Sequence, residues 1–284
     1  MPDPIARAVY RRAVHAFRSD SGDECMSLLH QLLANTSLMQ REVSFFCECL
    51  LLLGSSEAKF GRNVPTALHR FQESVTMLKE HFGERDERVA EVLLAMSTCL
   101  LHQHSGATVR DVSDALRHLE DAKRIVENCS SSSRVARSIL AADIYHNMGV
   151  CFELVAEYAD ALHNYTKSIS IRRLLKDGHG VVGLRLADTM EHVAMLLRGT
   201  SSTRTQHILQ RVLHTRRGCL PKHHPLIYRT LLLIAMVEHE VGNRVGMHKR
   251  IAAVLSALHD HPSRTVHVDP ALLAAARLLH DTLP

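Results

Sequence analysis

The sequence predicts an all-α chain, a solenoid of about six antiparallel helical hairpins followed by a C-terminal capping helix. The first observation is composition: the 284 residues include 7 Phe, 5 Tyr, no Trp, 13 Gly and 8 Pro. A many-stranded sandwich or barrel is typically richer in aromatic residues and in turn residues. The second observation is that apolar residues recur at helical spacing. The third is that one helical pattern returns every 42 to 48 residues.

The returning pattern marks the second helix of each predicted hairpin. It is a small residue, a bulky residue four positions later, and a small or medium residue three positions after that. Its six occurrences are Cys25/Leu29/Leu32, Ala67/Phe71/Ser74, Ala115/Leu119/Ala122, Ala161/Tyr165/Ser168, Thr205/Leu209/Val212 and Met247/Ile251/Val254. A small residue on an apolar helix face lets two helices approach closely, and the bulky residue fills the space beside the contact.

The remaining elements follow from this frame. The first helices lie upstream, around Ala13, Cys49, Ser97, Gly149, Ala194 and Ala235. Extra residues at Gly54–Val64 and Ser105–Val112 predict protruding loops. The serine run at 130–133 predicts a flexible joint near 129–134, because serine offers neither apolar burial nor helix propensity. Apolar residues at about 269–281 predict the capping helix. No shift in composition marks a boundary, so we expect a single domain over residues 1–284.

Residues 142–168 resemble the tetratricopeptide (TPR) repeat. The residues that carry the resemblance are Tyr145, Met148, Gly149, Phe152, Tyr158, Ala161, Tyr165 and Ser168. The long period and the connectors at Phe82–Ala90 and His224–Ile227 are similar to the kinesin light chain subclass. This resemblance implies a right-handed superhelical solenoid that joins other proteins, in a cytoskeletal or ciliary setting.

No motif in the sequence predicts catalysis. Gly178, Gly180 and Gly183 form a Gly-x-Gly-x-x-Gly string, but it follows a helical pattern instead of a strand and lacks an acid about 20 residues later. Histidines are scattered or two apart, as at His102 and His104, whereas a zinc site on a helix needs ligands at i and i+4. No nucleophile elbow, Walker loop or paired-carboxylate pattern is present. We therefore predict no enzyme activity, no cofactor and no metal site.

The cysteines and the termini bear on location. Seven cysteines, an odd number without paired spacing, indicate buried thiols in a reducing, intracellular compartment. We expect the cytoplasm, cytoskeleton or cilium. Arg7, Arg11, Arg12 and Arg18 leave a cleaved organellar leader open as an alternative. The apolar run Leu231–Val237 is far shorter than the roughly 20 residues of a spanning helix, so we expect no membrane insertion.

The resemblance also predicts a partner-binding groove. First helices of such solenoids line an extended inner surface, and the repeat frame gives its positions in repeats four, five and six. The predicted groove residues are Asp143, His146, Asn147, Val150, Glu153, Asp188, Glu191, His192, Met195, Arg198, Arg229, Leu232, Met236 and His239. Light chain repeats place asparagine in this groove to bind a peptide backbone, and only Asn147 matches. The basic carboxylate clamp of some TPR domains has no counterpart at these positions.

Charge predicts a second surface. Residues 1–142 carry 17 basic and 18 acidic side chains, whereas residues 143–284 carry 17 and 12. No acid lies between Glu191 and Glu238, and this stretch predicts a basic patch. The patch residues are Arg204, Arg211, Arg216, Arg217 and Lys222. Such a patch suits an acidic partner, such as a protein with an acidic segment or a nucleic-acid backbone, while a merely solvated basic face stays open as the alternative. Nucleic acid is not expected, because aromatic residues for base stacking are nearly missing here, and neither is a small-molecule substrate.

Two functions therefore follow from the sequence. The first is a non-catalytic scaffold or adaptor, a subunit of a larger assembly. The second is an organellar RNA- or ribosome-associated helical-repeat protein, which the basic stretch and the arginine-rich start favour.

Overall fold

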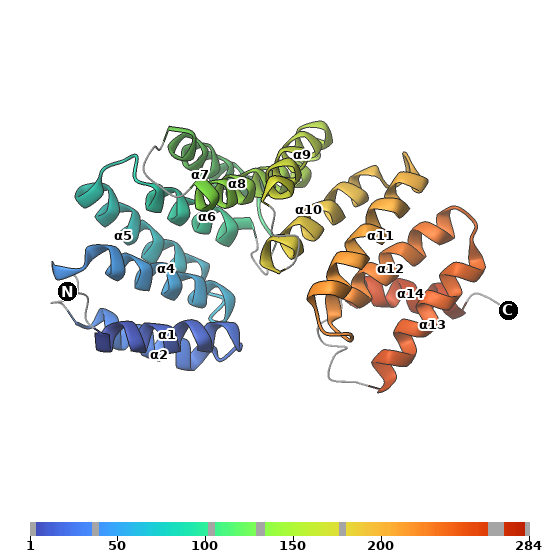
Figure 1. Cartoon of the computed structure of the whole chain (residues 1–284), viewed down its shortest axis with the longest axis horizontal. Coiled ribbons are helices and arrows are strands. Elements are labelled where there is room, and N and C mark those ends of the chain that lie inside the picture. The colour runs from blue at the N-terminus through green and yellow to red at the C-terminus, as the bar shows by residue number, and fades with distance from the viewer. Residues whose placement is uncertain are drawn as a thin grey trace. The chain divides into compact units, whose positions relative to one another are not determined.

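The structure is a computed structural model that describes residues 4–35, 40–101, 106–128, 134–175, 180–260 and 270–281. Within these residues it has thirteen helices and no strand (Figure 1), so the all-α prediction is confirmed. The chain forms two compact units, Met1–Ala161 and Leu162–Pro284. Each unit is a stack of helical hairpins of the TPR-like solenoid type.

The first unit holds the early hairpins. Its helices are α1 (Pro4–Arg18), α2 (Gly22–Leu33), α4 (Val43–Lys59), α5 (Val64–Phe82), α6 (Glu87–Leu101), α7 (Val109–Asn128), α8 (Arg134–Leu154) and the start of α9 (Tyr158–Leu174). The hairpins are α1–α2, α4–α5 and α6–α7, and they stack through the pairs α2–α4, α5–α6 and α7–α8. Helix α6 also packs against α4 and α8, so consecutive first helices lie side by side.

The second unit continues the same pattern. Beyond the rest of α9, its helices are α10 (Val181–Leu197), α11 (Ser202–Cys219), α12 (Pro225–Glu240), α13 (Arg244–Asp260) and α14 (Pro270–Asp281). Hairpins α10–α11 and α12–α13 stack through α11–α12, and α14 packs against both α12 and α13. The single continuous domain and the capping role of the last helix stay predictions. Most of the predicted joint, residues 129–133, lies outside the described residues.

Burial confirms the predicted register of the second helices. Every residue of the six-fold pattern is buried, and the six residues that open it, from Cys25 to Met247, are at most 1% exposed. Gly54 gives a second close approach, because a Cβ atom there would come within 2.7 Å of the Phe71 ring. Small side chains at the helix contacts therefore let the hairpins close, as the pattern predicted, except in the sixth, where Met247 takes this position.

Helices α6 and α12 begin within the two connectors, Phe82–Ala90 and His224–Ile227, that are similar to those of kinesin light chain repeats. Asp86 precedes α6, and its Oδ1 accepts a hydrogen bond from the Arg88 backbone N–H at 3.0 Å. His224 precedes α12, where its Nδ1 accepts from the backbone N–H of Leu226 at 3.2 Å and Pro225 takes the first helical position. Both residues satisfy a backbone donor that a helix start leaves unpaired.

The prediction of a loop at Gly54–Val64 is wrong for the first half of this range, which is helical. Helix α4 continues to Lys59, so only residues 60–63 separate it from α5. The extra residues lengthen the helix because Ser56 and Glu57 are buried against the core. The Oε1 of Glu57 lies 3.8 Å from Arg70 Nε of α5, within ion-pair distance. In the second expected loop, Ser105 lies outside the described residues, and α7 already begins at Val109.

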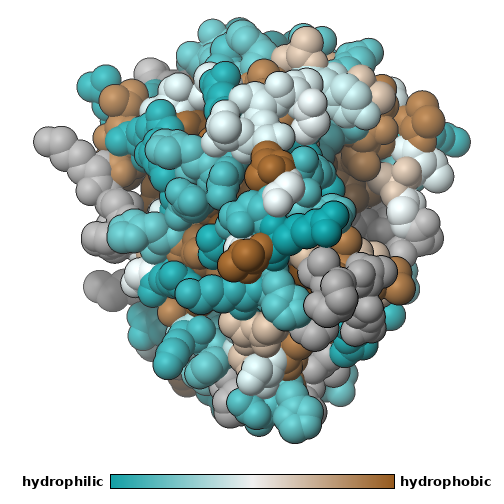
Figure 2. All heavy atoms as spheres, turned by 90° about the vertical axis from the view of Figure 1, so that its right-hand side faces the viewer, coloured by the Kyte–Doolittle hydropathy of each residue, from teal (hydrophilic) through white to brown (hydrophobic). Residues whose placement is uncertain are grey.

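One face of the molecule is mainly polar. Figure 2 shows the face on the right-hand side of Figure 1: most of it is hydrophilic, and hydrophobic side chains form small separate groups. Among the described helices, none combines the length and the apolar character that crossing a bilayer demands.

Candidate functional site

Helix α11 carries most of the predicted basic patch and has two distinct faces. Its buried face consists of Thr205, Leu209, Val212, Leu213 and Arg216. These positions follow the helical period, so they pack toward α10 and α12. Every other charged residue of the helix lies on the exposed side.

The charged residues on the exposed side of α11 are all basic. The exposed cations and histidines are Arg204, His207, Arg211, His214 and Arg217, and at 100° per residue they span an arc of about 140°. We call these five residues, together with the exposed Lys222 just beyond the helix, the basic face. Among the described residues, none of its four cations forms an ion pair. The charge of this face is therefore not neutralised by nearby acids of the described chain.

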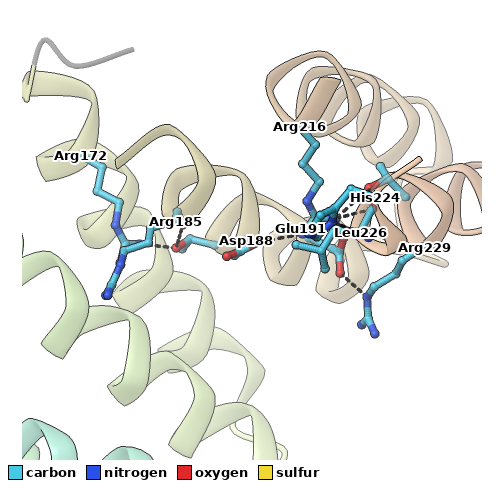
Figure 3. A network of polar contacts seen from close by, with 10 residues as sticks. Arg172, Arg185, Asp188, Glu191, Arg216, His224, Leu226 and Arg229 are labelled. Atoms are coloured by element: carbon cyan, nitrogen blue, oxygen red, sulfur yellow. Dashed lines mark hydrogen bonds and ion pairs between the residues drawn. The ribbon is translucent and has the colours of Figure 1, made fainter. Parts of the chain in front are cut away.

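Arg216 does not belong to this surface, which corrects the sequence prediction. It is 1% exposed and lies on the buried face of α11, about 100° around the helix from the exposed Arg217. Figure 3 shows its guanidinium pointing into a polar cluster between helices. Its Nη2 donates to Asp188 Oδ1 at 2.7 Å, and its Nη1 donates to Glu191 Oε2 and, at 2.7 Å, to the hydroxyl of Thr230. A count of charges along the sequence cannot distinguish Arg216 from Arg217, because it does not show which face of the helix each residue occupies.

The Arg216 cluster fixes three helices against one another. Asp188 and Glu191 come from α10, Arg216 from α11 and Thr230 from α12. Glu191 is 6% exposed and also accepts from Arg229 Nε at 2.7 Å. Hydrogen bonds between ionised groups are the stronger kind, and a buried charge needs such partners to offset desolvation. The cluster thus positions the helix that carries the basic face.

A second buried arginine repeats part of this arrangement. Arg172 of α9, labelled in Figure 3, is 5% exposed. It donates from Nη1 to the hydroxyls of Ser168 and Thr189. Arg172 and Arg216 both lie eleven residues after the small residue of their repeat, and Thr189 and Thr230 both lie five before the small residue of the next first helix. Sequence reasoning missed these residues, although this recurrence was a signal that could have found them.

Groove residues predicted in repeat four lie on α8 in the first unit. Asp143, His146, Val150 and Glu153 are half-buried. Asn147 is 8% exposed, and its Nδ2 donates to Thr98 Oγ1 of α6 at 2.8 Å. The one asparagine that matches the light chain pattern therefore links neighbouring first helices.

Groove residues predicted in repeats five and six divide into two groups. Asp188, Glu191 and Arg229 belong to the Arg216 cluster, and Leu232 is fully buried. Leu232 is thus part of the hydrophobic core of the second unit and does not line a groove. The other predicted residues are accessible at least in part; they are His192, Met195, Arg198, Met236 and His239. Their role in binding stays a prediction.

The described side chains suggest packing more than reactivity. Within the described ranges, no three His, Cys, Asp or Glu side chains gather closely enough to hold a metal ion. Burial raises the pKa of Cys49 and Cys151 to about 12 and that of Cys99 to about 11. A thiol attacks as its thiolate, and a raised pKa keeps these three cysteines in the protonated thiol form at neutral pH.

Comparison with known proteins places the fold. No known family profile and no curated protein matches the sequence. BtubC (BKLC) from P. vanneervenii is similar with a TM-score of 0.63 at 14% identity, over 89% of this chain and 92% of that one. A putative kinesin light chain with nearly identical TPR-like repeats from Podosopora anserina is similar with a TM-score of 0.55 at 12% identity, over 75% of this chain and 95% of that one. Aspartyl phosphate phosphatase F from Bacillus subtilis is similar with a TM-score of 0.62 at 12% identity, over 98% of this chain and 69% of that one.

At these low identities the similarity shows the fold alone. This fold agrees with the burial of the second helices in the predicted register and with the capped helix starts at the two connectors. The chain therefore has the fold of the TPR-repeat proteins, including those with kinesin light chain-like repeats.

Proposed function

We propose that this chain is a non-catalytic scaffold that holds an acidic segment of a partner protein on the basic face of α11. TPR-like solenoids suggest protein interaction, and their helices offer long surfaces for it. The observation that carries the proposal is the row of exposed cations along one helix, none of which is paired within the described chain. Arg204 and Arg217 are separated by about 20 Å along the helix axis, which is the length of about six residues of extended chain.

The basic face suits a protein better than a nucleic acid. Its exposed positions hold no Phe, Tyr or Trp, and aromatic stacking contributes much of the binding of single-stranded RNA. The similarity to a putative kinesin light chain favours a subunit of a cytoskeletal or ciliary assembly as the setting. The accessible groove residues on α10 and α12 are a second proposed contact for the same partner.

Charge reversal tests the proposal. The variant carries Arg204→Glu, Arg211→Glu and Arg217→Glu and leaves the buried Arg216 in place. Its matched control reverses three exposed cations of the first unit, Arg11, Lys79 and Arg85, so that both proteins have the same net charge. Each tagged protein is used for affinity purification from the native source, followed by quantitative mass spectrometry.

We expect the α11 variant to lose partner proteins that the control and the wild type retain. Undiminished recovery with the α11 variant would overturn the proposal. Selective loss of RNA or ribosomal proteins would instead favour the organellar alternative, and N-terminal sequencing of the native protein would then reveal a cleaved leader.

A further inference from the structure

A cavity of about 490 Å³ opens at the C-terminal end of α11. Its apolar wall is formed by Ile227 and Leu231 of α12 and Ala257 of α13, and its polar wall by Arg217, Lys222 and His223. Cavities of roughly 300 to 1,000 Å³ are typical of ligand sites in proteins. This one is large enough to take a leucine or phenylalanine side chain.

The polar wall of the cavity is cationic and partly fixed. Nδ1 of His223 lies 2.9 Å from the hydroxyl of Tyr228, and this hydrogen bond holds the Tyr228 side chain at the edge of the cavity. Arg217 and Lys222 are exposed and form no ion pair with any described residue. The described residues that line the cavity include no acid. An occupant that matches both walls therefore joins an apolar group to negative charge.

The cavity is continuous with the basic face, since Arg217 and Lys222 belong to both. From the structure we infer that the cavity anchors one bulky apolar side chain of the bound acidic segment, at the end of the segment that reaches Arg217. This inference rests on the function proposed above and defines its ligand: a run of Asp or Glu lying along Arg211 and Arg204, followed by Leu or Phe. The site lies outside the groove predicted on the first helices.

Peptides of defined sequence test the inference on the full chain. Three fluorescein-labelled peptides are amidated at the C-terminus, so that negative charge comes from side chains and the label alone. They contain five glutamates followed by phenylalanine, five glutamates followed by alanine, and five glutamines followed by phenylalanine. Fluorescence anisotropy at low and moderate salt gives the Kd of each.

We expect the acidic phenylalanine peptide to bind about ten-fold or more tightly than the acidic alanine peptide, from the transfer of one aromatic side chain out of water. Ala257→Phe fills the cavity and should weaken the phenylalanine peptide to the level of the alanine peptide. His259→Phe is the matched control, because His259 is exposed on the same helix and lies on its opposite side from Ala257; it should change neither Kd. Arg211→Glu should weaken both acidic peptides.

The failures of the two proposals are distinguishable. Equal Kd values for the two acidic peptides, both weakened by Arg211→Glu, would overturn the anchor and leave the acidic-segment function intact. Binding of the glutamine peptide as tightly as its acidic counterpart would overturn both. Because the peptide series is read on the wild-type chain, poor folding of the Ala257→Phe variant would not obscure the result.

Discussion

Removing the Arg216 guanidinium should strongly destabilise the protein. Arg216→Met keeps the length of the buried side chain but leaves Glu191, which is 6% exposed, with Arg229 as its remaining cation in the cluster. Removing one partner of a buried ion pair costs about 3–5 kcal/mol. Asp188 adds less, because its side chain is 45% exposed and water can replace the lost bond. At about 2–4 °C per kcal/mol for a chain of this size, Tm should fall by roughly 6–20 °C.

The neighbouring arginine provides the control. Arg217 is exposed, so Arg217→Met should change the free energy of unfolding by no more than about 0.5 kcal/mol. Urea unfolding followed by circular dichroism measures both variants without adding salt. The double variant Arg216→Met with Glu191→Gln also removes the buried carboxylate charge, which the single variant leaves poorly compensated, and it should recover part of the loss.

Equal stability of Arg216→Met and Arg217→Met would refute this reasoning. A double variant whose loss equals the sum of the two single losses would also refute it, because side chains in one network are expected to couple.

Three further predictions concern other parts of the chain. Ala161→Arg forces a long cation into a fully buried helix contact and should cost about 3 kcal/mol or more; an unchanged Tm in thermal unfolding would contradict the repeat register. Hydrogen bonds from Arg88 lower the pKa of Asp86 below its ordinary value of 3.8, so this carboxylate stabilises the fold above that pH and the contribution is lost as the pH falls. Asp86→Asn should therefore lose up to about 1 kcal/mol at pH 7, with a difference from wild type in urea unfolding that fades in acid; a difference independent of pH would contradict the ion pair. Iodoacetamide followed by mass spectrometry should leave Cys49 and Cys151 unmodified in the native protein at pH 8 and modify both in urea, since burial raises their pKa to about 12; rapid native labelling of either would show that its helix contact opens.

The sequence predicted the second helices well because their packing follows a short-range rule. Cys25, Ala67 and Ala115 each begin a pattern set by the helical period, and the period alone decides which face is buried. The basic patch was predicted less well. Arg216 and Arg217 are adjacent in sequence and identical in charge, and only the helical phase relative to Thr205 separates the buried one from the exposed one. Two partners of Arg216, Asp188 and Glu191, lie on the first helix of the same repeat and the third, Thr230, on the first helix of the next, so a linear charge count could not find them.

Loop lengths were the other point at which sequence reasoning failed. The extra residues after Gly54 could extend either a helix or a loop, because both options satisfy the period of the repeats. In the structure these residues are helical, with Glu57 buried beside Arg70. This is a tertiary contact between α4 and α5, which the repeat period does not reveal.

The two faces of α11 separate folding from recognition within one helix. The buried cluster sets the rotation of the helix about its axis, so each exposed cation keeps its direction when another is replaced. Substitutions at Arg204, Arg211 or Arg217 can therefore accumulate without cost to the core. A surface of this kind can change its choice of partner through single mutations, while the neighbouring Arg216 stays under selection for stability. Related chains should then keep the buried arginine and vary the exposed ones.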